Sequence, residues 1–368
     1  MIPASYYAPI FYNLMLFLVI IKCVSLISLS KRYDKIERMK VLILSTFLII
    51  FLGNRPISGS YFGDTSTYAS FYDFLSLYGY DSFDNQEWLW NTITLFCAKI
   101  GLTVHGWFLV IDFLYIGLII WACKRCANFN IFLAILFCFS SFIFYSGAVN
   151  GLRIGVANSL LFVALTYISQ KGKKNHIIAI LLSFLAFGIH KSMILPILSM
   201  SLSLYFIKNT KFIIKIWVVC IFISLILGNQ ISAMFESLGL FSIDKRFEEY
   251  LNQHTELIDQ FSKTGFRWDF LLYSSVPIFL GGYLVLKRKI MDKQFLILLH
   301  TYIITNAFWI LVIHASFSNR FASLSWSLYP ILLAYPLINF KIWNRQERKT
   351  ALFLVGHMAF SYLMWLKS

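Results

Sequence analysis

One stretch of the chain decides its fold class: residues 131–147, which read IFLAILFCFSSFIFYSG. It contains no charged side chain, and a helix needs about 20 apolar residues to cross the roughly 30 Å hydrocarbon core of a membrane. Similar apolar runs cover 6–29, 294–314 and 350–366. Hydrophobic residues make up 59% of the chain and charged residues only 13%. These features predict a polytopic membrane protein built of helices, not of a barrel.

Clusters of Lys and Arg between the apolar runs indicate the orientation of the chain, because such clusters stay on the cytoplasmic side. The clusters lie at residues 31–40, 124–125, 171–174, 208–215, 287–293 and 341–349. All six can be cytoplasmic only if the short apolar segment 88–102 lies in or dips into the interface without crossing. The net charge of +15 is therefore interpreted as a topology signal, and no nucleic-acid partner is expected.

The resulting prediction is an all-α polytopic membrane protein of about twelve transmembrane helices, with both termini outside and a single domain over residues 1–368. The expected spans are 6–29, 41–53, 106–123, 131–148, 152–169, 177–190, 192–207, 213–228, 268–286, 294–314, 321–340 and 350–366. Two long segments, 54–105 and 229–267, then face outward. Both carry aromatic residues at helical spacing, so each is expected to contain amphipathic helices.

Two arginines begin predicted membrane helices at the outer surface. Arg153 lies in NGLRIGVA, residues 150–157, and Arg320 lies in SNRF, residues 318–321. A guanidinium keeps its charge and is costly in hydrocarbon, so an arginine at this depth is expected to bind a ligand. Its planar fork fits phosphate oxygens with two hydrogen bonds, which suits a pyrophosphate on a lipid tail. The alternative is pairing with carboxylates of the outer loops.

Asp64 precedes a helical pattern in the first long outer segment. Apolar positions recur there at Tyr68, Phe71, Tyr72, Leu75 and Tyr78. Asp64 is therefore either the N-cap of this helix or a residue that faces a ligand. Both roles are compatible, because Gly63 before it permits a tight turn. Aromatic side chains at this boundary, Tyr68 among them, can stack on sugar rings.

Three histidines are candidate site residues, and two of them, His190 and His254, are candidates for a general base, because imidazole titrates near neutral pH. His190 ends a predicted span and is followed by Lys191, which places an imidazole beside an ammonium group. His254 shares the apolar face of a helical pattern in the second outer segment, where it is either catalytic or packed against the membrane domain. His314 ends another span and is the weakest candidate of the three.

Several of these residues fall in motifs that resemble a known family. NGLRIGVAN, residues 150–158, is followed by LAFGIHKS, residues 185–192. Together they resemble the EpsG family, whose members have an N-x-x-R-x-x-x-A helix and then a helix that ends in histidine. GDTSTY, residues 63–68, and SNR, residues 318–320, resemble its flanking elements. This chain has Ile154 where the family often has glutamine.

EpsG proteins are similar to Wzy-type polymerases of O-antigen, capsule and exopolysaccharide repeat units. The resemblance implies a GT-C-type glycosyltransferase in the bacterial plasma (inner) membrane, with its active site on the periplasmic or extracellular side. It also implies that the substrate is an oligosaccharide linked to undecaprenyl pyrophosphate. The partners expected from the resemblance are membrane lipid and, from the same pathway, a flippase and a chain-length regulator. No metal and no other cofactor is expected, in keeping with the absence of an Asp-x-Asp pair.

On this interpretation, the glycan passes from its lipid pyrophosphate to a sugar hydroxyl of a new lipid-linked repeat. Arg153 and Arg320 bind the pyrophosphate and stabilise its developing charge. His190, or as second choice His254, accepts the proton of the hydroxyl. Further residues expected to contact the substrate are Asp64, Tyr68, Asn150, Lys191, His314 and Asn319.

Other functions share some of these features. A ligase that passes finished polymer to lipid A core or protein would use the same donor. A transporter or flippase should carry polar or charged residues halfway across several spans, whereas nearly all charges here lie at predicted span ends. Asp112 is the one acidic residue well inside a span, and it is expected to be paired or close to the outer interface. A membrane acyltransferase is disfavoured, because no histidine precedes His105.

Overall fold

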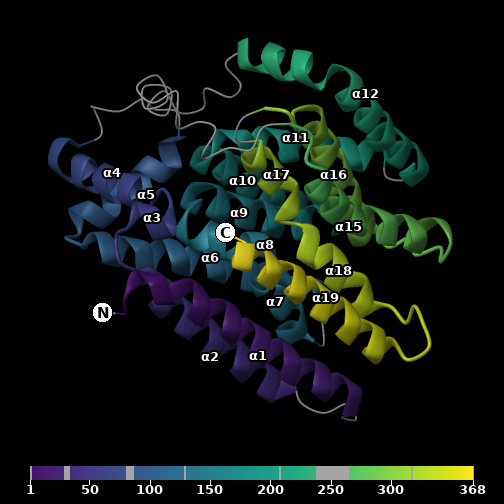
Figure 1. Cartoon of the computed structure of the whole chain (residues 1–368), viewed down its shortest axis with the longest axis horizontal. Helices are drawn as coiled ribbons and strands as arrows, with labels where there is room; N and C mark the ends of the chain where they lie inside the picture. The colour runs from purple at the N-terminus through teal and green to yellow at the C-terminus, as the bar shows by residue number, and fades with distance from the viewer. Residues whose placement is uncertain are drawn as a thin grey trace. The chain divides into compact units, whose positions relative to one another are not determined.

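The structure of the protein, a computed structural model, describes residues 2–28, 34–79, 87–127, 130–206, 209–237, 265–315 and 318–367. Within these ranges every regular element is a helix (Figure 1). Long apolar runs form helices in a membrane because each backbone N–H and C=O group is then bonded within its own segment. The all-α prediction is confirmed for the described part of the chain.

The helices have the following bounds. The first half of the chain contains η1 (Ala4–Tyr6), α1 (Tyr7–Ser28), α2 (Asp34–Gly53), α3 (Gly59–Phe62), α4 (Thr65–Tyr78), α5 (Trp88–Lys99), α6 (Val104–Cys126), α7 (Ile131–Phe139), α8 (Phe142–Val149), α9 (Leu152–Ile168), α10 (Lys173–Ile189) and η4 (Lys191–Met193). The second half contains α11 (Ile194–Tyr205), α12 (Thr210–Ser237), α15 (Trp268–Leu286), α16 (Lys293–Leu311), α17 (Asn319–Trp326), α18 (Tyr329–Asn339) and α19 (Gln346–Lys367).

Six segments of the described chain are long and apolar enough to cross a membrane. They are Ala4–Ser28, Val104–Cys126, Thr210–Phe235, Trp268–Leu286, Lys293–Leu311 and Asn319–Asn339. The chain is thus a polytopic membrane protein, and the figure of about twelve spans stays a prediction. The expected interfacial segment 88–102 contains α5, whose 12 residues are too few to cross about 30 Å as a straight helix.

The expected span 131–148 is not one straight helix. α7 and α8 meet at Ser140 and Ser141 with a bend of 71°. Both serines are buried, and the Ser140 hydroxyl donates to the carbonyl of Leu136. A serine that bonds the backbone of the preceding turn bends a helix, an effect that the apolar pattern does not record. The expected span 321–340 corresponds to the crossing segment Asn319–Asn339, in which a short turn separates α17 from α18.

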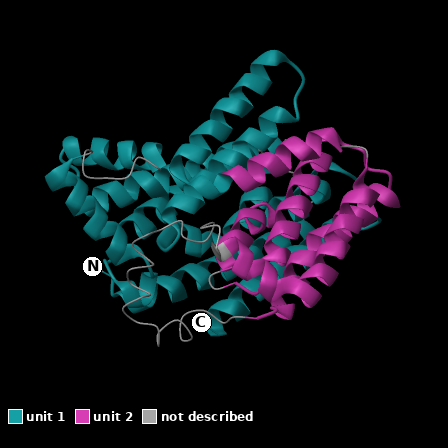
Figure 2. Cartoon of the chain, turned by 90° about the horizontal axis from the view of Figure 1, so that it is seen from above, with its two compact units in different colours: residues 1–193, 330–368 teal, residues 194–329 magenta. Residues whose placement is uncertain are grey.

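The described chain forms two compact units (Figure 2). The first comprises residues 1–193 and 330–368. Its centre is α9, which packs against α6 and α10 and buries nearly all its side chains. Such burial is expected for a helix that is apolar around its whole circumference. α1 packs against α19, so two helices from opposite ends of the chain lie side by side.

The second unit comprises residues 194–329 and is built around α16, which contacts α11, α12, α15 and α17. Trp217 of α12 donates a hydrogen bond to Asn306 of α16 (2.8 Å), which donates to Ser325 of α17 (3.2 Å). Hydrogen bonds between side chains hold helices together in a membrane, where apolar side chains pack almost equally well on lipid and on another helix. α12 also extends beyond the expected span 213–228.

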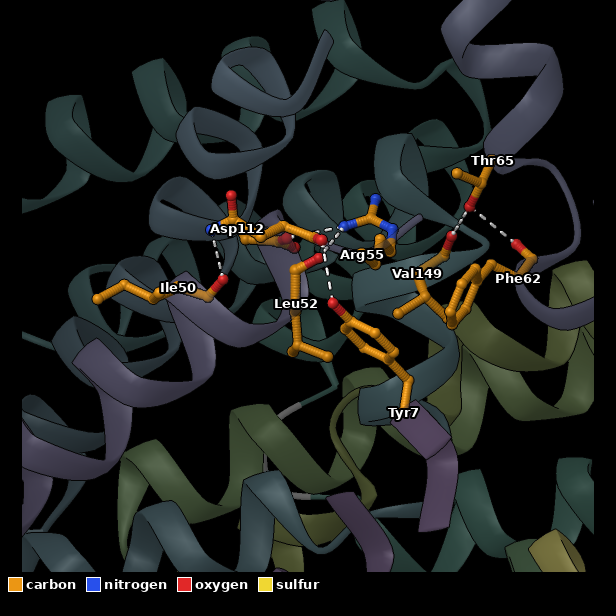
Figure 3. A network of polar contacts seen from close by, with 9 residues as sticks. Tyr7, Ile50, Leu52, Arg55, Phe62, Thr65, Asp112 and Val149 are labelled. Carbon is orange, nitrogen blue, oxygen red and sulfur yellow. Dashed lines mark hydrogen bonds and ion pairs between the residues drawn. The ribbon is translucent and has the colours of Figure 1, made fainter. Parts of the chain in front are cut away.

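A buried ion pair fixes the end of α2 to α6 in the first unit (Figure 3). Arg55 Nη1 lies 2.9 Å from Asp112 Oδ2, and both side chains are shielded from solvent. Arg55 Nη1 also donates to the carbonyl of Leu52 (2.7 Å), and the guanidinium lies over the ring of Phe108. A buried charge needs such partners. The expectation that Asp112 is paired is thereby confirmed.

Candidate functional site

Glu87 connects two of the predicted site residues, Arg153 and His190. Its Oε2 lies 2.6 Å from Arg153 Nη1, and its Oε1 lies 2.7 Å from His190 Nδ1. The other ring nitrogen of His190, Nε2, lies 2.9 Å from the hydroxyl oxygen of Ser192. These four residues are called the Glu87 cluster below. The cluster is partly open, since the side chains of Glu87 and His190 are 12% and 13% exposed.

The fold brings the four residues together from different elements of the first unit. Glu87 directly precedes α5, and Arg153 is the second residue of α9. His190 follows the last residue of α10, and Ser192 lies in η4. α9 and α10 pack along each other and are joined by a short connection, so the start of α9 lies near the end of α10. The packing of these two apolar helices therefore places Arg153 near His190.

Gly188 lets α5 approach the end of α10. A Cβ atom at this position would lie only 2.6 to 2.8 Å from atoms of the Trp88 ring. The Trp88 ring also packs against Phe184 of α10, with 5.5 Å between ring centroids. A close-packed interior leaves no room for a methyl group in such a contact. Since Trp88 directly follows Glu87, this contact holds the carboxylate beside His190.

A tight turn before α4 is fastened to the start of α9. Asn150 Oδ1 accepts a hydrogen bond from the backbone N–H of Asp64 (2.9 Å). Gly63 adopts a φ of 56°, and a Cβ atom there would collide with the Asn150 side chain. The Thr65 hydroxyl donates to the carbonyl of Val149 (2.8 Å; Figure 3). Asn150, a predicted substrate contact, therefore uses its amide oxygen to position this turn.

Asp64 stands at the N-cap of α4, but its carboxylate makes no capping hydrogen bond. Of the two roles expected for Asp64, capping is therefore wrong in the structure. The reason is local, because the residue has φ −69° and ψ 6°, which is not the extended backbone that typical N-caps adopt. Contact with a ligand stays a prediction for this carboxylate.

Tyr68 lies beneath Arg153. Its ring centroid is 5.7 Å from Arg153 Cζ, a distance that permits a cation–π contact. The indole rings of Trp90 and Trp107 pack around it, with centroids 5.8 and 6.4 Å away. Burial raises the pKa of Tyr68 more than the Arg153 charge lowers it, so the phenol stays neutral. In this structure Tyr68 supports the guanidinium, and its buried ring is not open to a sugar.

The charges of the cluster keep Glu87 ionised. Burial alone would raise the pKa of Glu87, but the Arg153 charge and the hydrogen bond with His190 together lower it to about 2. An ionised carboxylate can only accept hydrogen bonds, so the hydrogen shared by Glu87 and His190 belongs to His190 Nδ1. In the neutral ring, Nε2 then carries the basic lone pair.

This arrangement combines two chemical capabilities. Arg153 provides a permanent positive charge that can bind an anion. His190 provides a basic nitrogen, and Glu87 fixes the orientation of the ring as the carboxylate of a catalytic triad does. Lys191 adds an ammonium group in the same turn as Ser192. A cation next to an oriented base is suited to moving a group from a phosphate leaving group to a hydroxyl.

The structure brings together the six predicted site residues of the first unit, and these are Asp64, Tyr68, Asn150, Arg153, His190 and Lys191. The other predicted residues do not belong to this unit. Asn319 and Arg320 begin α17 in the second unit and are exposed. His314 follows α16, and its ring packs so closely on Gly228 of α12 that a Cβ atom there would collide with it. His254 lies outside the described residues.

Glu87 and Ser192 were not among the predicted site residues. Glu87 is the last residue before the apolar segment 88–102, and a carboxylate directly at that border was the available signal. Ser192 is the last residue of the LAFGIHKS motif, directly after Lys191. Its contact with His190 depends on the conformation of η4, which the motif does not specify.

Comparison with known proteins adds one finding. Neither the curated proteins nor the solved structures gave a match. A model of the EpsG family matches residues 38–368, which include all four residues of the Glu87 cluster. The match extends over most of the chain and contains the motifs at 150–158 and 185–192. The chain therefore belongs to the EpsG family.

Proposed function

We propose that this protein polymerises lipid-linked oligosaccharide repeat units. It transfers the glycan from polyprenyl pyrophosphate to a sugar hydroxyl of a new lipid-linked repeat. Membership of the EpsG family fits a polysaccharide polymerase in general. The observation that carries the proposal is the pairing of Arg153 and His190 on the carboxylate of Glu87, because it sets a cation for the pyrophosphate beside an oriented base.

In this mechanism, Arg153 binds the donor pyrophosphate, and Arg320 is the second proposed cation. Negative charge grows on the pyrophosphate as the bond to the anomeric carbon breaks, and a preorganised guanidinium stabilises that charge. The position of Arg153 in the first turn of α9 supports this role. The positive end of a helix dipole favours anions at such a place.

His190 accepts the proton that the attacking hydroxyl loses. Glu87 acts as a positioning residue, because it selects the ring tautomer and stabilises the imidazolium that forms. Among the predicted substrate contacts, Asp64 and Lys191 are proposed to orient the acceptor sugar or the pyrophosphate. His254 stays the second choice for the base, and His314 and Asn319 stay proposed substrate contacts.

The wider setting is part of the same proposal. The GT-C class, the undecaprenyl carrier and the supply of repeats by a flippase rest on the likeness to Wzy-type polymerases. A site on the outer face of the bacterial plasma membrane rests on the distribution of Lys and Arg. The product is an O-antigen, a capsule or an exopolysaccharide, whose length a separate regulator sets.

Deletion of the gene tests the function directly. Loss of a polymerase leaves single repeat units on the carrier or the cell surface, and the intact gene restores long polymer. Long polymer that accumulates on the carrier would instead indicate a ligase. Repeat units that stay in the cytoplasmic leaflet would indicate a flippase.

Arg153→Ala tests the site. The variant is expected to make at least about 100-fold less polymer, the typical cost of one electrostatic group in a transition state. Arg288→Ala is the matched control, because Arg288 is an exposed arginine in a predicted cytoplasmic segment. Polymer length on gels and protein level in the membrane are measured together. Full-length polymer from Arg153→Ala at a normal protein level would show that Arg153 is not the pyrophosphate ligand.

A further inference from the structure

The hydroxyl of Ser192 is hydrogen-bonded to the basic nitrogen of His190. Its hydroxyl oxygen lies 2.9 Å from Nε2, while Nδ1 faces Glu87 at 2.7 Å. Because Glu87 is ionised and only accepts, Nδ1 carries the ring hydrogen and Nε2 has the lone pair. The Ser192 hydroxyl therefore donates to the very nitrogen that the proposed mechanism uses as a base.

An acceptor sugar can reach this nitrogen in two ways. It can displace the Ser192 hydroxyl, or it can pass its proton through that hydroxyl. Displacement leaves a hydroxyl without its partner at a residue that is only 9% exposed, which is unfavourable. The turn also keeps Ser192 close to the ring, since the N–H of Met193 bonds the carbonyl of His190 (3.1 Å) and Met193 is buried. Transfer through the hydroxyl needs no rearrangement.

We propose that Ser192 is a further catalytic residue, which relays the proton of the acceptor hydroxyl to His190; this rests on the proposed function of the same site. The acceptor O–H bond breaks, and its proton moves to Ser192 Oγ while the proton of Ser192 moves to His190 Nε2. The acceptor oxygen forms its new bond to the anomeric carbon. The bond between the anomeric carbon and the pyrophosphate oxygen breaks at the same time, and its electron pair leaves with the pyrophosphate.

A covalent role for Ser192 is the alternative. Serine, histidine and glutamate in this order are also the nucleophile, base and orienting acid of many hydrolases. A glycan bound to serine oxygen, however, has an ordinary glycosidic bond with a poor leaving group. Such an intermediate would gain nothing over the product. The relay therefore predicts that no glycan mass is added to the protein during turnover.

The experiment uses the full-length protein in vesicles with a synthetic lipid-linked repeat unit, and wild-type polymerisation is established first. Ser192→Ala is expected to lower kcat about 10- to 100-fold, as for loss of proton transfer, with KM changed less than about twofold. Ser192→Thr keeps the hydroxyl and is expected to restore most of kcat. Ser183→Ala is the matched control, because the hydroxyl of this buried serine bonds the Ala179 carbonyl of its own helix, and it should leave kcat unchanged.

The possible results separate the relay from its rivals. A kcat of Ser192→Ala equal to or above wild type would overturn the relay, because the hydroxyl would then only block the base. Equal losses in Ser192→Ala and Ser192→Thr, together with loss of donor binding, would indicate a structural role and also overturn it. A glycan-sized mass on the intact protein would favour the covalent alternative over the relay. Failure of the wild type to extend the repeat unit would count against the proposed function itself.

Discussion

At the scale of single residues, Glu87 positions both Arg153 and His190, because each of its carboxylate oxygens binds one of them. Glu87→Gln keeps the shape and removes the charge. The amide can present either an oxygen or an NH2 group to His190, so the tautomer is no longer fixed. We expect kcat of polymerisation to fall about 10- to 100-fold while donor binding holds or tightens, because Arg153 loses an anionic partner. Titrating the vesicle assay with donor measures both quantities, and weaker donor binding would contradict this account of Glu87.

Glu87 should also make the stability of the protein depend on pH. Its pKa drops from an ordinary 4.5 to about 2 on folding, so folding favours the ionised carboxylate. The stabilisation is fully present above about pH 4.5 and is lost as the pH falls through about 2. A shift of this size corresponds to about 3 kcal/mol. Thermal unfolding in detergent should show the melting temperature of wild type approaching that of Glu87→Gln on acidification. A gap that stays constant with pH would exclude this contribution.

Some residues of the site could be predicted because the sequence next to them is informative, and others could not because their contacts depend on packing. Arg153 and His190 could be predicted because a charge or an imidazole at the end of an apolar run is visible locally. Glu87 could not, since it lies 66 positions before its partner Arg153 and the pairing depends on the packing of α5 on α10. The burial of Tyr68 under Arg153 has the same origin, because the helical pattern shows an apolar face but not what covers it.

At the scale of helices, the contact between α5 and α10 sets the position of Glu87. Gly188→Ala would put a methyl group against Trp88 and shift α5. We expect a loss of about 1–3 kcal/mol in stability and reduced polymer synthesis, with partial recovery when Trp88→Leu is added. Gly117→Ala serves as control, because nothing lies within 4 Å of a Cβ atom there. Melting temperature and polymer yield of the three variants are compared. Normal yield from Gly188→Ala would show that this contact does not position the site.

The ion pair between α2 and α6 gives a second prediction about helices. Asp112→Asn leaves the buried Arg55 without its counter-charge and should destabilise the protein by about 3–5 kcal/mol. Replacing both residues, as Arg55→Met with Asp112→Leu, should recover most of that loss. Asp269→Asn removes the partner of Arg267 in an exposed pair and should cost less than about 1 kcal/mol. Denaturation in mixed detergent micelles compares the variants. A double variant that is no more stable than Asp112→Asn would refute the buried-charge explanation.

Most helices could be predicted from the sequence because apolar length and basic clusters are local properties. The break at Ser140 and Ser141 could not, because a hydroxyl that bonds its own backbone looks like any other small residue in an apolar run. The continuation of α12 past residue 228 was missed for a related reason. A glycine such as Gly228 is typical of a helix end. In the structure it lies within α12, where the absence of a side chain allows the ring of His314 to pack closely against the helix.

At the scale of the whole molecule, the family and the membrane location of the chain were readable from composition and motifs. Its orientation is tested by labelling on the two sides of α6. Lys99 precedes this helix and Lys124 lies in its last turn, and both residues are exposed. In a background without other cysteines, Lys99→Cys should react with an impermeant maleimide in spheroplasts. Lys124→Cys should react only after the membrane is opened. The reverse result would place the Glu87 cluster on the cytoplasmic side and contradict an outward site.

The carboxylate that faces Arg153 has one more consequence under the proposed function. A partner held in place by the fold competes at an effective concentration far above that of most dissolved ions. Chloride and inorganic phosphate are thus kept off the arginine between turnovers. A diphosphate on a lipid tail is instead confined to the bilayer, which enriches it where the arginine lies. By this competition, Glu87 makes Arg153 selective for anionic substrates that are confined to the membrane over anions dissolved in water.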